Sequence, residues 1–209
     1  MKFIFSVQKQ QNSFLPTDSF PTLLHSSEDC KGLLKAAIRD PNPTVVLENE
    51  ILYGSAFEMK DEDWDNEDFV IPFGQAKIER EGTDVTIVAF SIGCRISLEA
   101  AELLAQDGIS VEVLNLRSIR PLDRESIIKS VKKTNHLISV EFGWPQCGIG
   151  AEILSTVMES DAFDYLDAPA VRVTGADIPM PYAKQLEDAC MPTAQDIVHT
   201  VKNILKIKQ

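Results

Sequence analysis

The sequence predicts an α/β protein, a three-layer sandwich in which helices cover both faces of a mainly parallel sheet. Short apolar, β-branched segments alternate with amphipathic segments of about ten residues, the pattern of parallel strands joined by helices. One segment, Val85–Phe90, is apolar almost throughout, as expected for a strand buried on both faces. We therefore expect right-handed crossover connections between neighbouring strands.

The first third of the chain predicts less structure. Residues 1–27 are polar and irregular, and we expect a poorly ordered lead. A helix is predicted from the capping signal Ser27-Glu28-Asp29 to the break Asp40-Pro41-Asn42-Pro43, and a strand over Thr44–Leu47. One helix and one strand cannot bury their apolar faces alone, so residues 28–72 should lean on the main domain or belong to something larger.

An acidic segment, residues 61–68, follows this unit. Charge runs of this kind are usually solvated loops, and we favour that interpretation over a metal site or a surface for a basic partner.

The main domain is expected from about Phe73 to the end of the chain. A helix over Cys94–Gln106 should bury Leu98, Ala101 and Ala105, and Gly108 should stop it. Asp123 is expected to cap the next helix. The remaining elements are strands over Val111–Leu116, Leu137–Val140 and Ala170–Val173, and helices over Ile149–Met158 and Ala194–Leu205.

Composition limits the possible partners. The 209 residues have room for one domain, or one domain and a fragment, and 44% are hydrophobic, enough for a real core. A net charge of −12 argues against a nucleic-acid partner, and no apolar run reaches the length that spans a bilayer. The four cysteines form no CxxC pair, which favours reduced thiols over a zinc site.

Three segments follow strands at the sheet edge where doubly wound folds bind ligands. Cys94 beside Arg95 has no histidine at a fixed nearby spacing, so an ordinary buried thiol is favoured over a nucleophile. Arg117 and Arg120 either clamp an anion or pair with acidic groups, and pairing is favoured. The third segment, Gly143–Gly150, is either a phosphate-binding loop at a helix N-terminus or a tight turn.

The histidines share no motif, and the sequence contains no P-loop, nucleophile elbow or HExxH. The residues alone therefore indicate an interaction or regulatory domain. At the helix break, Asp40 and Asn42 add side-chain oxygens to the carbonyls near Ala37 and Ile38. Such an oxygen set suits a hard cation, but a plain helix stop with an Asx turn is the favoured interpretation.

Several longer motifs carry a resemblance to a known family. They are AAIRD at 36–40, VVLENE at 45–50, IRP at 119–121, GWPQ at 143–146, LDAPAVRVTGAD at 166–177 and PMPYA at 179–183. In this order they resemble the C-terminal part of the pyruvate dehydrogenase beta subunits of mitochondria, from about Ser27 to Ile207. The branched-chain 2-oxoacid relatives have Glu-Pro-Lys in place of Glu48-Asn49-Glu50, which favours pyruvate.

The resemblance implies a transketolase C-terminal fold for residues 73–209 and a remnant of the thiamine-pyrimidine-binding domain for residues 28–72, while residues 1–27 are unmatched. It implies a part in the oxidative decarboxylation of pyruvate with thiamine diphosphate and in acetyl transfer to lipoyl groups, which yields acetyl-CoA. The family's activating glutamate has no counterpart in this sequence. We therefore expect the chain alone to be inactive, with no catalytic or thiamine-binding residue of its own.

The alternatives are a non-catalytic assembly module and a branched-chain 2-oxoacid dehydrogenase beta subunit. The implied partners are an alpha subunit, a second beta subunit and the dihydrolipoyl acetyltransferase core, in the mitochondrial matrix. Docking on that core is implied for Asp167 and the C-terminal Ile207, and Trp144 is implied in assembly. No nucleic-acid or membrane partner is expected.

The resemblance also implies a structural potassium ion at the helix break. Its ligands would be the carbonyls of Ala37 and Ile38 and the side chains of Asp40 and Asn42.

Overall fold

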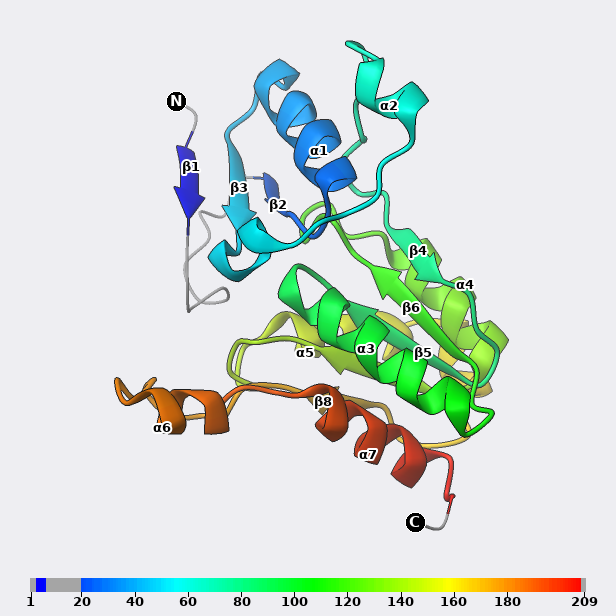
Figure 1. The fold of residues 1–209 in the computed structure, drawn as a ribbon. Helices are drawn as coiled ribbons and strands as arrows, with labels where there is room; N and C mark the ends of the chain where they lie inside the picture. The colour runs from blue at the N-terminus through cyan, green and yellow to red at the C-terminus, as the bar shows by residue number, and fades with distance from the viewer. Residues whose placement is uncertain (1–2, 7–19, 208–209) are drawn as a thin grey trace.

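The computed structural model describes residues 3–6 and 20–207, which form a small parallel sheet and a larger, mainly parallel one (Figure 1). The larger sheet has five strands in the order β4-β6-β5-β7-β8. All neighbouring strands are parallel except β4, which is antiparallel to β6. The strands are β4 (Lys77–Arg80), β5 (Val85–Ala89), β6 (Val111–Asn115), β7 (Leu137–Val140) and β8 (Val171–Val173). The predicted sheet is therefore confirmed.

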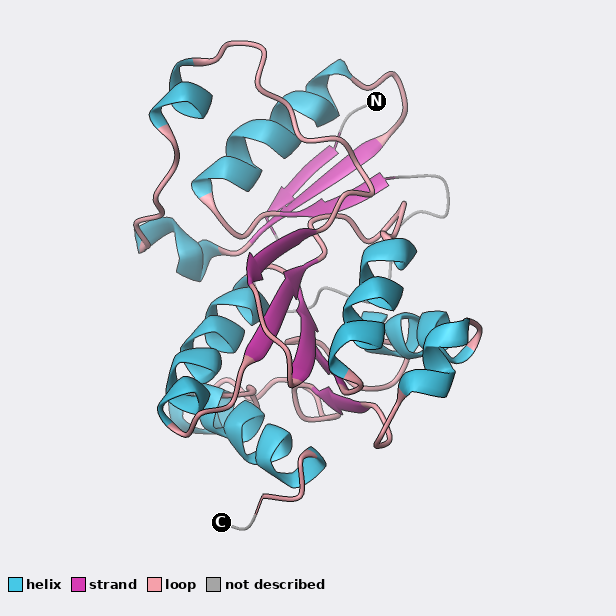
Figure 2. Ribbon diagram, turned by 90° about the vertical axis from the view of Figure 1, so that its right-hand side faces the viewer, coloured by secondary structure: helices cyan, strands magenta, loops and turns pink. Residues whose placement is uncertain are grey.

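Helices cover both faces of this sheet, as Figure 2 shows. One layer is α3 (Ile92–Gln106) with α7 (Ala194–Ile204), packed on a core that includes Ile87 and Val113. The other layer is α4 (Arg124–Thr134) with α5 (Ile149–Met158), followed by the short helix η2 (Asp161–Tyr165). The predicted three-layer α/β sandwich is therefore confirmed. A separate short helix, α6 (Lys184–Ala189), projects from the sandwich in Figure 1.

The small sheet has three parallel strands in the order β1-β3-β2. They are β1 (Phe3–Ser6), β2 (Phe20–Leu23) and β3 (Thr44–Glu48), and β3 runs into the short helix η1 (Glu50–Gly54). Helix α1 (Ser27–Arg39) covers one face, where Leu33 packs against Val46. On the other face Leu23, Val45 and Leu47 join the core beneath α4 and α5. The small unit thus packs on the main domain, as expected for elements that cannot bury their own faces.

The prediction of an irregular lead over residues 1–27 is wrong for residues 3–6 and 20–27. Residues 1–2 and 7–19 lie outside the described residues. Phe20 to Leu23 form a strand because β3 offers them a parallel partner, and His25 is buried. Helix α3 also differs in phase from the prediction, since Ala105 is exposed and Leu104 is fully buried. The helix begins at Ile92 rather than Cys94, and its buried face includes Ile96, Ala100, Ala101 and Leu104.

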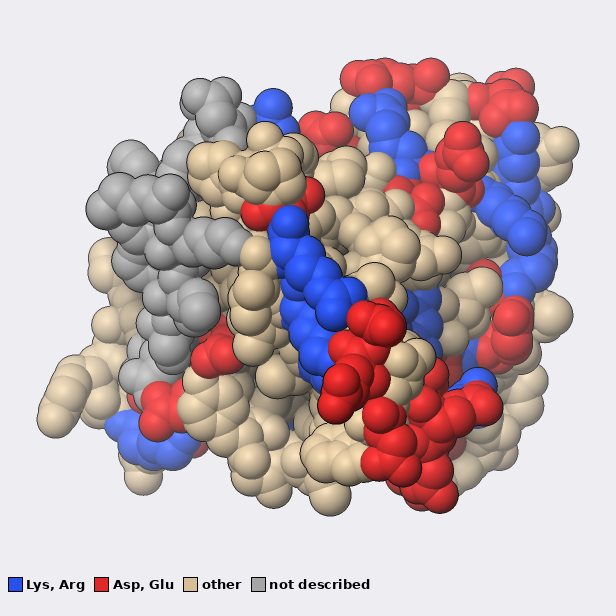
Figure 3. All heavy atoms as spheres, turned by 90° about the horizontal axis from the view of Figure 1, so that it is seen from above, with Lys and Arg blue, Asp and Glu red and all other residues tan. Residues whose placement is uncertain are grey.

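The acidic segment contains a short helix, α2 (Asp61–Asp65), beside α1. Lys31 Nζ donates to the carbonyl of Asp63 at 2.8 Å, and Arg39 pairs with Asp68 at 3.3 Å. Figure 3 shows this end of the molecule, where acidic side chains gather beside Lys and Arg side chains. The segment is largely exposed, as predicted, but basic residues of α1 hold it in place.

Candidate functional sites

The Gly-rich turn between β7 and α5 is filled by a carboxyl group of the chain itself. Glu141 is 1% exposed and accepts hydrogen bonds from the N–H groups of Ile149 at 3.1 Å and Gly150 at 2.9 Å. A Cβ atom on Gly150 would lie 2.6 Å from Ser139 Oγ and 2.8 Å from Glu141 Oε1. The donors that a phosphate would use are therefore engaged, and the glycines allow close packing.

The thiol at the start of α3 is not a nucleophile. Cys94 is fully buried, and this burial, with smaller contributions from Glu79 and Asp29, raises the pKa of its thiol well above the usual range. A protonated, inaccessible thiol does not attack a substrate. The interpretation of Cys94 as a packing residue is the one the structure supports.

Arg117, at the carboxyl end of β6, belongs to a buried ion network. Its Nε donates to Asp29 Oδ1 at 2.7 Å and its Nη2 donates to Glu28 Oε1 at 2.8 Å. Glu28 also accepts from Lys77 at 2.6 Å, and Asn115 Nδ2 donates to Asp29 at 3.0 Å. The favoured pairing with acidic groups is confirmed for Arg117, and this network joins the start of α1 to the larger sheet.

Electrostatics in this network follow from its geometry. Burial raises the pKa of Glu28, but hydrogen bonds from Lys77 and Arg117 outweigh it, so the pKa lies below its ordinary value. Burial likewise lowers the pKa of Lys77, and its contacts with Glu28 and Glu79 outweigh this and raise it. Both groups therefore stay charged near neutral pH.

The helix break has the geometry of an Asx turn. Asp40 Oδ1 accepts from the backbone N–H of Asn42 at 2.8 Å and from its Nδ2 at 2.9 Å. Pro41 has no N–H to donate to the carbonyl of Ala37, and the N–H of Asn42 donates to the side chain of Asp40. The donor set is entirely oxygen, which fits a hard cation, while the turn itself needs none.

Trp144 anchors a projecting arm. Its Nε1 donates to the carbonyl of Ile178 at 3.0 Å, and the half-buried indole lies beside the Gly-rich turn. Beyond Ile178 the arm carries exposed apolar side chains, with Tyr182 fully exposed and Leu186 59% exposed. Exposed apolar side chains thus lie along residues 178–186, next to Trp144, the residue for which the resemblance implies a part in assembly.

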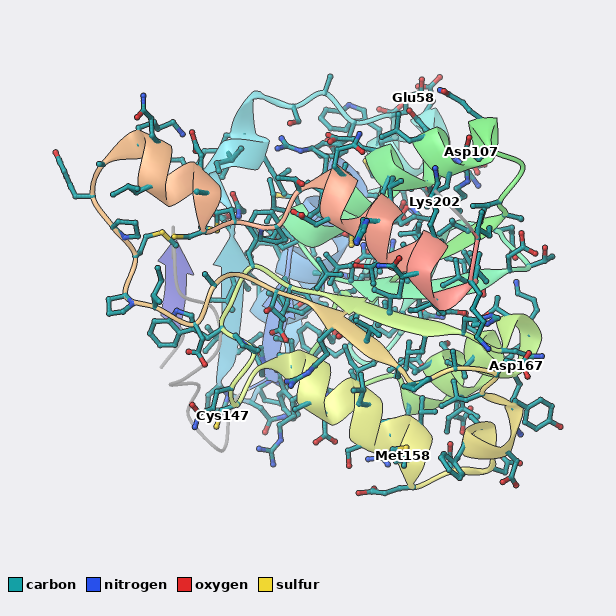
Figure 4. The ribbon with its side chains drawn as sticks, turned by 90° about the horizontal axis from the view of Figure 1, so that it is seen from below. Glu58, Asp107, Cys147, Met158, Asp167 and Lys202 are labelled. Carbon is teal, nitrogen blue, oxygen red and sulfur yellow. The ribbon has the colours of Figure 1, made fainter. Side chains whose placement is uncertain are left out.

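Asp167 lies at the rim of a hollow of about 700 Å³ between the end of α5 and the segment after η2. Met158, which is 58% exposed, and Phe163 supply apolar walls. Figure 4 places Asp167 and Met158 at the same side of the molecule, with Cys147 at the opposite end of α5. Asn135 Nδ2 donates to Asp167 Oδ2 at 3.2 Å. Ile207 is 42% exposed and belongs to a different segment, after α7.

Within residues 3–6 and 20–207, no helix combines the length and apolar character needed to cross a membrane. The same residues contain no group of three or more His, Cys, Asp or Glu side chains placed to hold a metal ion.

Fold and sequence together define the class of protein. A family model described as "Transketolase, C-terminal domain" matches residues 74–197, more than half of the chain, and the chain belongs to this family. A solved "Split gene transketolase, inactive beta4 tetramer" superposes with a TM-score of 0.72, covering 92% of this chain and 59% of that chain at 24% identity. This likeness shows the shared fold.

Closer relatives are curated proteins named "Pyruvate dehydrogenase E1 component subunit beta, mitochondrial". The chain is 61% identical to the Saccharomyces cerevisiae protein over 185 residues, covering 88% of this chain and 50% of that protein. It is 61% identical to the Caenorhabditis elegans protein, covering 88% and 52%, and 57% identical to the Homo sapiens protein, covering 87% and 50%. The chain spans about half the length of the curated relatives it matches.

Two residues that the sequence did not single out are central to these sites. Glu141 caps the Gly-rich turn, and Asp29 pairs with Arg117 in the buried ion network. Glu141 follows an apolar strand directly and precedes a glycine-rich helix start, a spacing that signals a carboxyl group capping a helix. Asp29 sits in the first turn of a helix, where exposed acidic groups are common, so only the position of Arg117 reveals its burial.

Proposed function

We propose that this chain acts as a beta subunit of a pyruvate dehydrogenase complex. That complex decarboxylates pyruvate oxidatively with thiamine diphosphate and transfers the acetyl group to lipoyl groups of the dihydrolipoyl acetyltransferase, which leads to acetyl-CoA. The observation that carries the proposal is 57–61% identity to the curated beta subunits over 87–88% of this chain. Their names also favour the mitochondrial matrix, and they favour pyruvate over branched-chain 2-oxoacids.

Within that complex we assign this chain an assembly role. Arg117 is paired internally, Cys94 is buried, and the Gly-rich turn is closed by Glu141, so these groups support packing rather than chemistry. Residues 73–209 would form the transketolase C-terminal domain and residues 28–72 part of the pyrimidine-binding domain. Thiamine diphosphate would be bound by the intact heterotetramer, formed with alpha subunits and a second beta subunit.

A second candidate function is a non-catalytic interaction module. The exposed apolar arm favours it, because Ile178, Tyr182 and Leu186 present their side chains to solvent and are suited to burial against a partner. The arm is equally suited to the subunit contacts of the first proposal. Co-expression with an alpha subunit, followed by size-exclusion chromatography, separates them: a joint peak supports the beta-subunit role, and separate peaks support a module that binds another partner.

Docking on the acetyltransferase core is tested at Asp167. We expect Asp167→Ala to weaken binding of the acetyltransferase's subunit-binding domain by about 10- to 150-fold, because a charge-assisted contact with a basic partner contributes about 1.5–3 kcal/mol. Glu58→Ala is the control, since Figure 4 shows Glu58 well apart from Asp167, at another edge of the molecule. Equal affinity of the two variants, measured by calorimetry, would remove Asp167 from the docking surface.

A potassium ion at the helix break is also proposed, held by the carbonyls of Ala37 and Ile38 and the side chains of Asp40 and Asn42. Potassium at ten times its Kd should raise the free energy of unfolding by about 1.4 kcal/mol. The measurement is urea unfolding in KCl against NaCl at equal ionic strength. Asp40→Ala should abolish the difference; an equal response in that variant would refute the site.

A further inference from the structure

A cavity of about 200 Å³ opens at the carboxyl ends of β2 and β3, the two neighbouring parallel strands of the small sheet. One wall comes from the connection between β2 and α1. The other comes from the end of β3 and the segment that follows it, which includes η1, the short cyan helix after β3 in Figure 1. Leu24, Leu52 and Phe57 supply apolar walls. Parallel α/β sheets bind their ligands at this edge, so the position is one where a site is expected.

His25 is the buried polar group of this cavity. The residue is 5% exposed, and its Nδ1 lies 3.1 Å from the carbonyl oxygen of Ser91. A carbonyl only accepts, so Nδ1 carries the proton and Nε2 presents a lone pair. Among the described residues no group forms a hydrogen bond with that Nε2. Burial lowers the pKa of His25, against the opposing charges of Glu79 and Asp29, so the ring is neutral near pH 7.

Glu48 adds a carboxylate to the cavity wall. Its Oε2 accepts from the hydroxyl of Tyr53 at 2.6 Å, and among the described residues it has no ion-pair partner. Burial, together with Glu48 and Asp29, raises the pKa of the Cys30 thiol on the same wall, which keeps it neutral. The cavity therefore offers acceptors and negative charge.

From these groups we infer that the cavity binds a small organic cation with a flat apolar body and an N–H donor group. The cation would lie near Glu48, one N–H would reach His25 Nε2, and the body would lie between Leu24, Leu52 and Phe57. A volume of about 200 Å³ is below the roughly 300–1,000 Å³ of drug-sized sites, which restricts the ligand to about one ring.

Two other ligand classes fit less well. A metal ion is disfavoured because the described residues place no three His, Cys, Asp or Glu side chains together, although His25, Cys30 and Glu48 share the cavity wall. An anion would meet the N-terminus of α1, but Glu28 and Asp29 in its first turn and Glu48 opposite supply negative charge there.

The test uses the full chain and three probes of one shape: benzamidine as the cation, benzamide as the neutral isostere and benzoate as the anion. The chain has an internal reference, because Cys30 on the cavity wall and Cys147 on the Gly-rich turn are both exposed. At ten times its Kd benzamidine leaves about one site in eleven empty, so alkylation of Cys30 by iodoacetamide should slow about tenfold. Alkylation of Cys147 should not change.

Two variants are then compared by calorimetry of benzamidine binding. Glu48→Gln keeps the shape of the side chain and should weaken benzamidine about tenfold, since it removes the charge from a charge-assisted contact. Glu50→Gln is the matched control, because Glu50 is exposed on η1 and does not line the cavity. The inference is overturned if benzamide or benzoate protects Cys30 as well as benzamidine does, if no probe protects it, or if both variants bind benzamidine equally.

Discussion

Replacing Arg117 by methionine should destabilise the chain far more than the loss of any exposed ion pair. The Arg117 side chain is 7% exposed and that of Asp29 is fully buried, with 2.7 Å between Nε and Oδ1. Methionine fills similar space without charge, so Arg117→Met leaves the Asp29 carboxylate buried, and its remaining contacts among the described residues are with Asn115 Nδ2 and the N–H of His25. The perturbation isolates the pairing between α1 and β6.

The magnitude follows from burial. Removing one partner of a buried ion pair costs about 3–5 kcal/mol, because the remaining charge keeps its desolvation penalty. For a chain of this size each kcal/mol lowers Tm by about 2–4 °C, so we expect Tm to fall by about 6–20 °C. Arg124→Met is the matched control: Arg124 is 45% exposed and pairs with Glu159 at 3.1 Å, so its loss should cost no more than about 1 kcal/mol.

Urea unfolding followed by circular dichroism provides the assay, with Asp29→Asn completing a double-mutant cycle. Arg117→Met leaves the charge of Asp29 buried without its partner, and Asp29→Asn removes that charge. The double variant should therefore lose clearly less stability than the sum of the losses of the two single variants. Additive losses, or an Arg117→Met variant as stable as Arg124→Met, would refute the reasoning.

Two other predictions concern packing and pH. Gly150→Ala should lower the free energy of unfolding by about 1–3 kcal/mol, since its Cβ would lie 2.8 Å from Glu141 Oε1. Gly54→Ala is the control and should be close to neutral, because a Cβ there would have nothing within 4 Å. Urea titrations of the two variants compare them. Burial lowers the pKa of His25 in the folded chain, while in the unfolded chain the pKa is about 6.5. Just below pH 6.5 the unfolded chain therefore binds a proton at His25 that the folded chain does not bind. The stability that His25 contributes is therefore present above about pH 6.5 and is lost as pH falls toward the folded pKa. His25→Asn should reduce the change of the urea unfolding midpoint between about pH 7 and 5. An unchanged dependence of the midpoint on pH would contradict this.

The main domain was predictable because its signals are local. Val85–Phe90 is apolar except for Thr86, which is typical of a strand covered on both faces, and α5 occupies the predicted residues, Ile149–Met158. The cap at Asp123 also holds, since its side chain accepts from the N–H of Ser126 at 3.0 Å. Each of these features depends on residues close together in the chain.

The missed elements depend on partners far away in sequence. β2 contains Pro21 and follows a polar stretch, so only pairing with β3 identifies it as a strand. β4 reads Lys-Ile-Glu-Arg, a pattern without a continuous apolar face, and it forms because the antiparallel edge of β6 supplies its hydrogen bonds. The His25 cavity has the same origin, since its walls come from two segments that meet only in the folded chain.

The Gly-rich turn shows why a local motif alone does not identify a ligand. Its sequence predicts backbone N–H groups exposed at a helix N-terminus, and the structure has those donors on Ile149 and Gly150. A phosphate and a glutamate carboxylate satisfy the same donors, so the motif is equally compatible with a cofactor site and with an internal cap. Glu141 decides between them, because it leaves the end of β7 at the position from which a side chain reaches both N–H groups. An acidic residue at the strand end therefore argues against phosphate binding, and it makes Trp144 and the arm it anchors a better candidate for assembly.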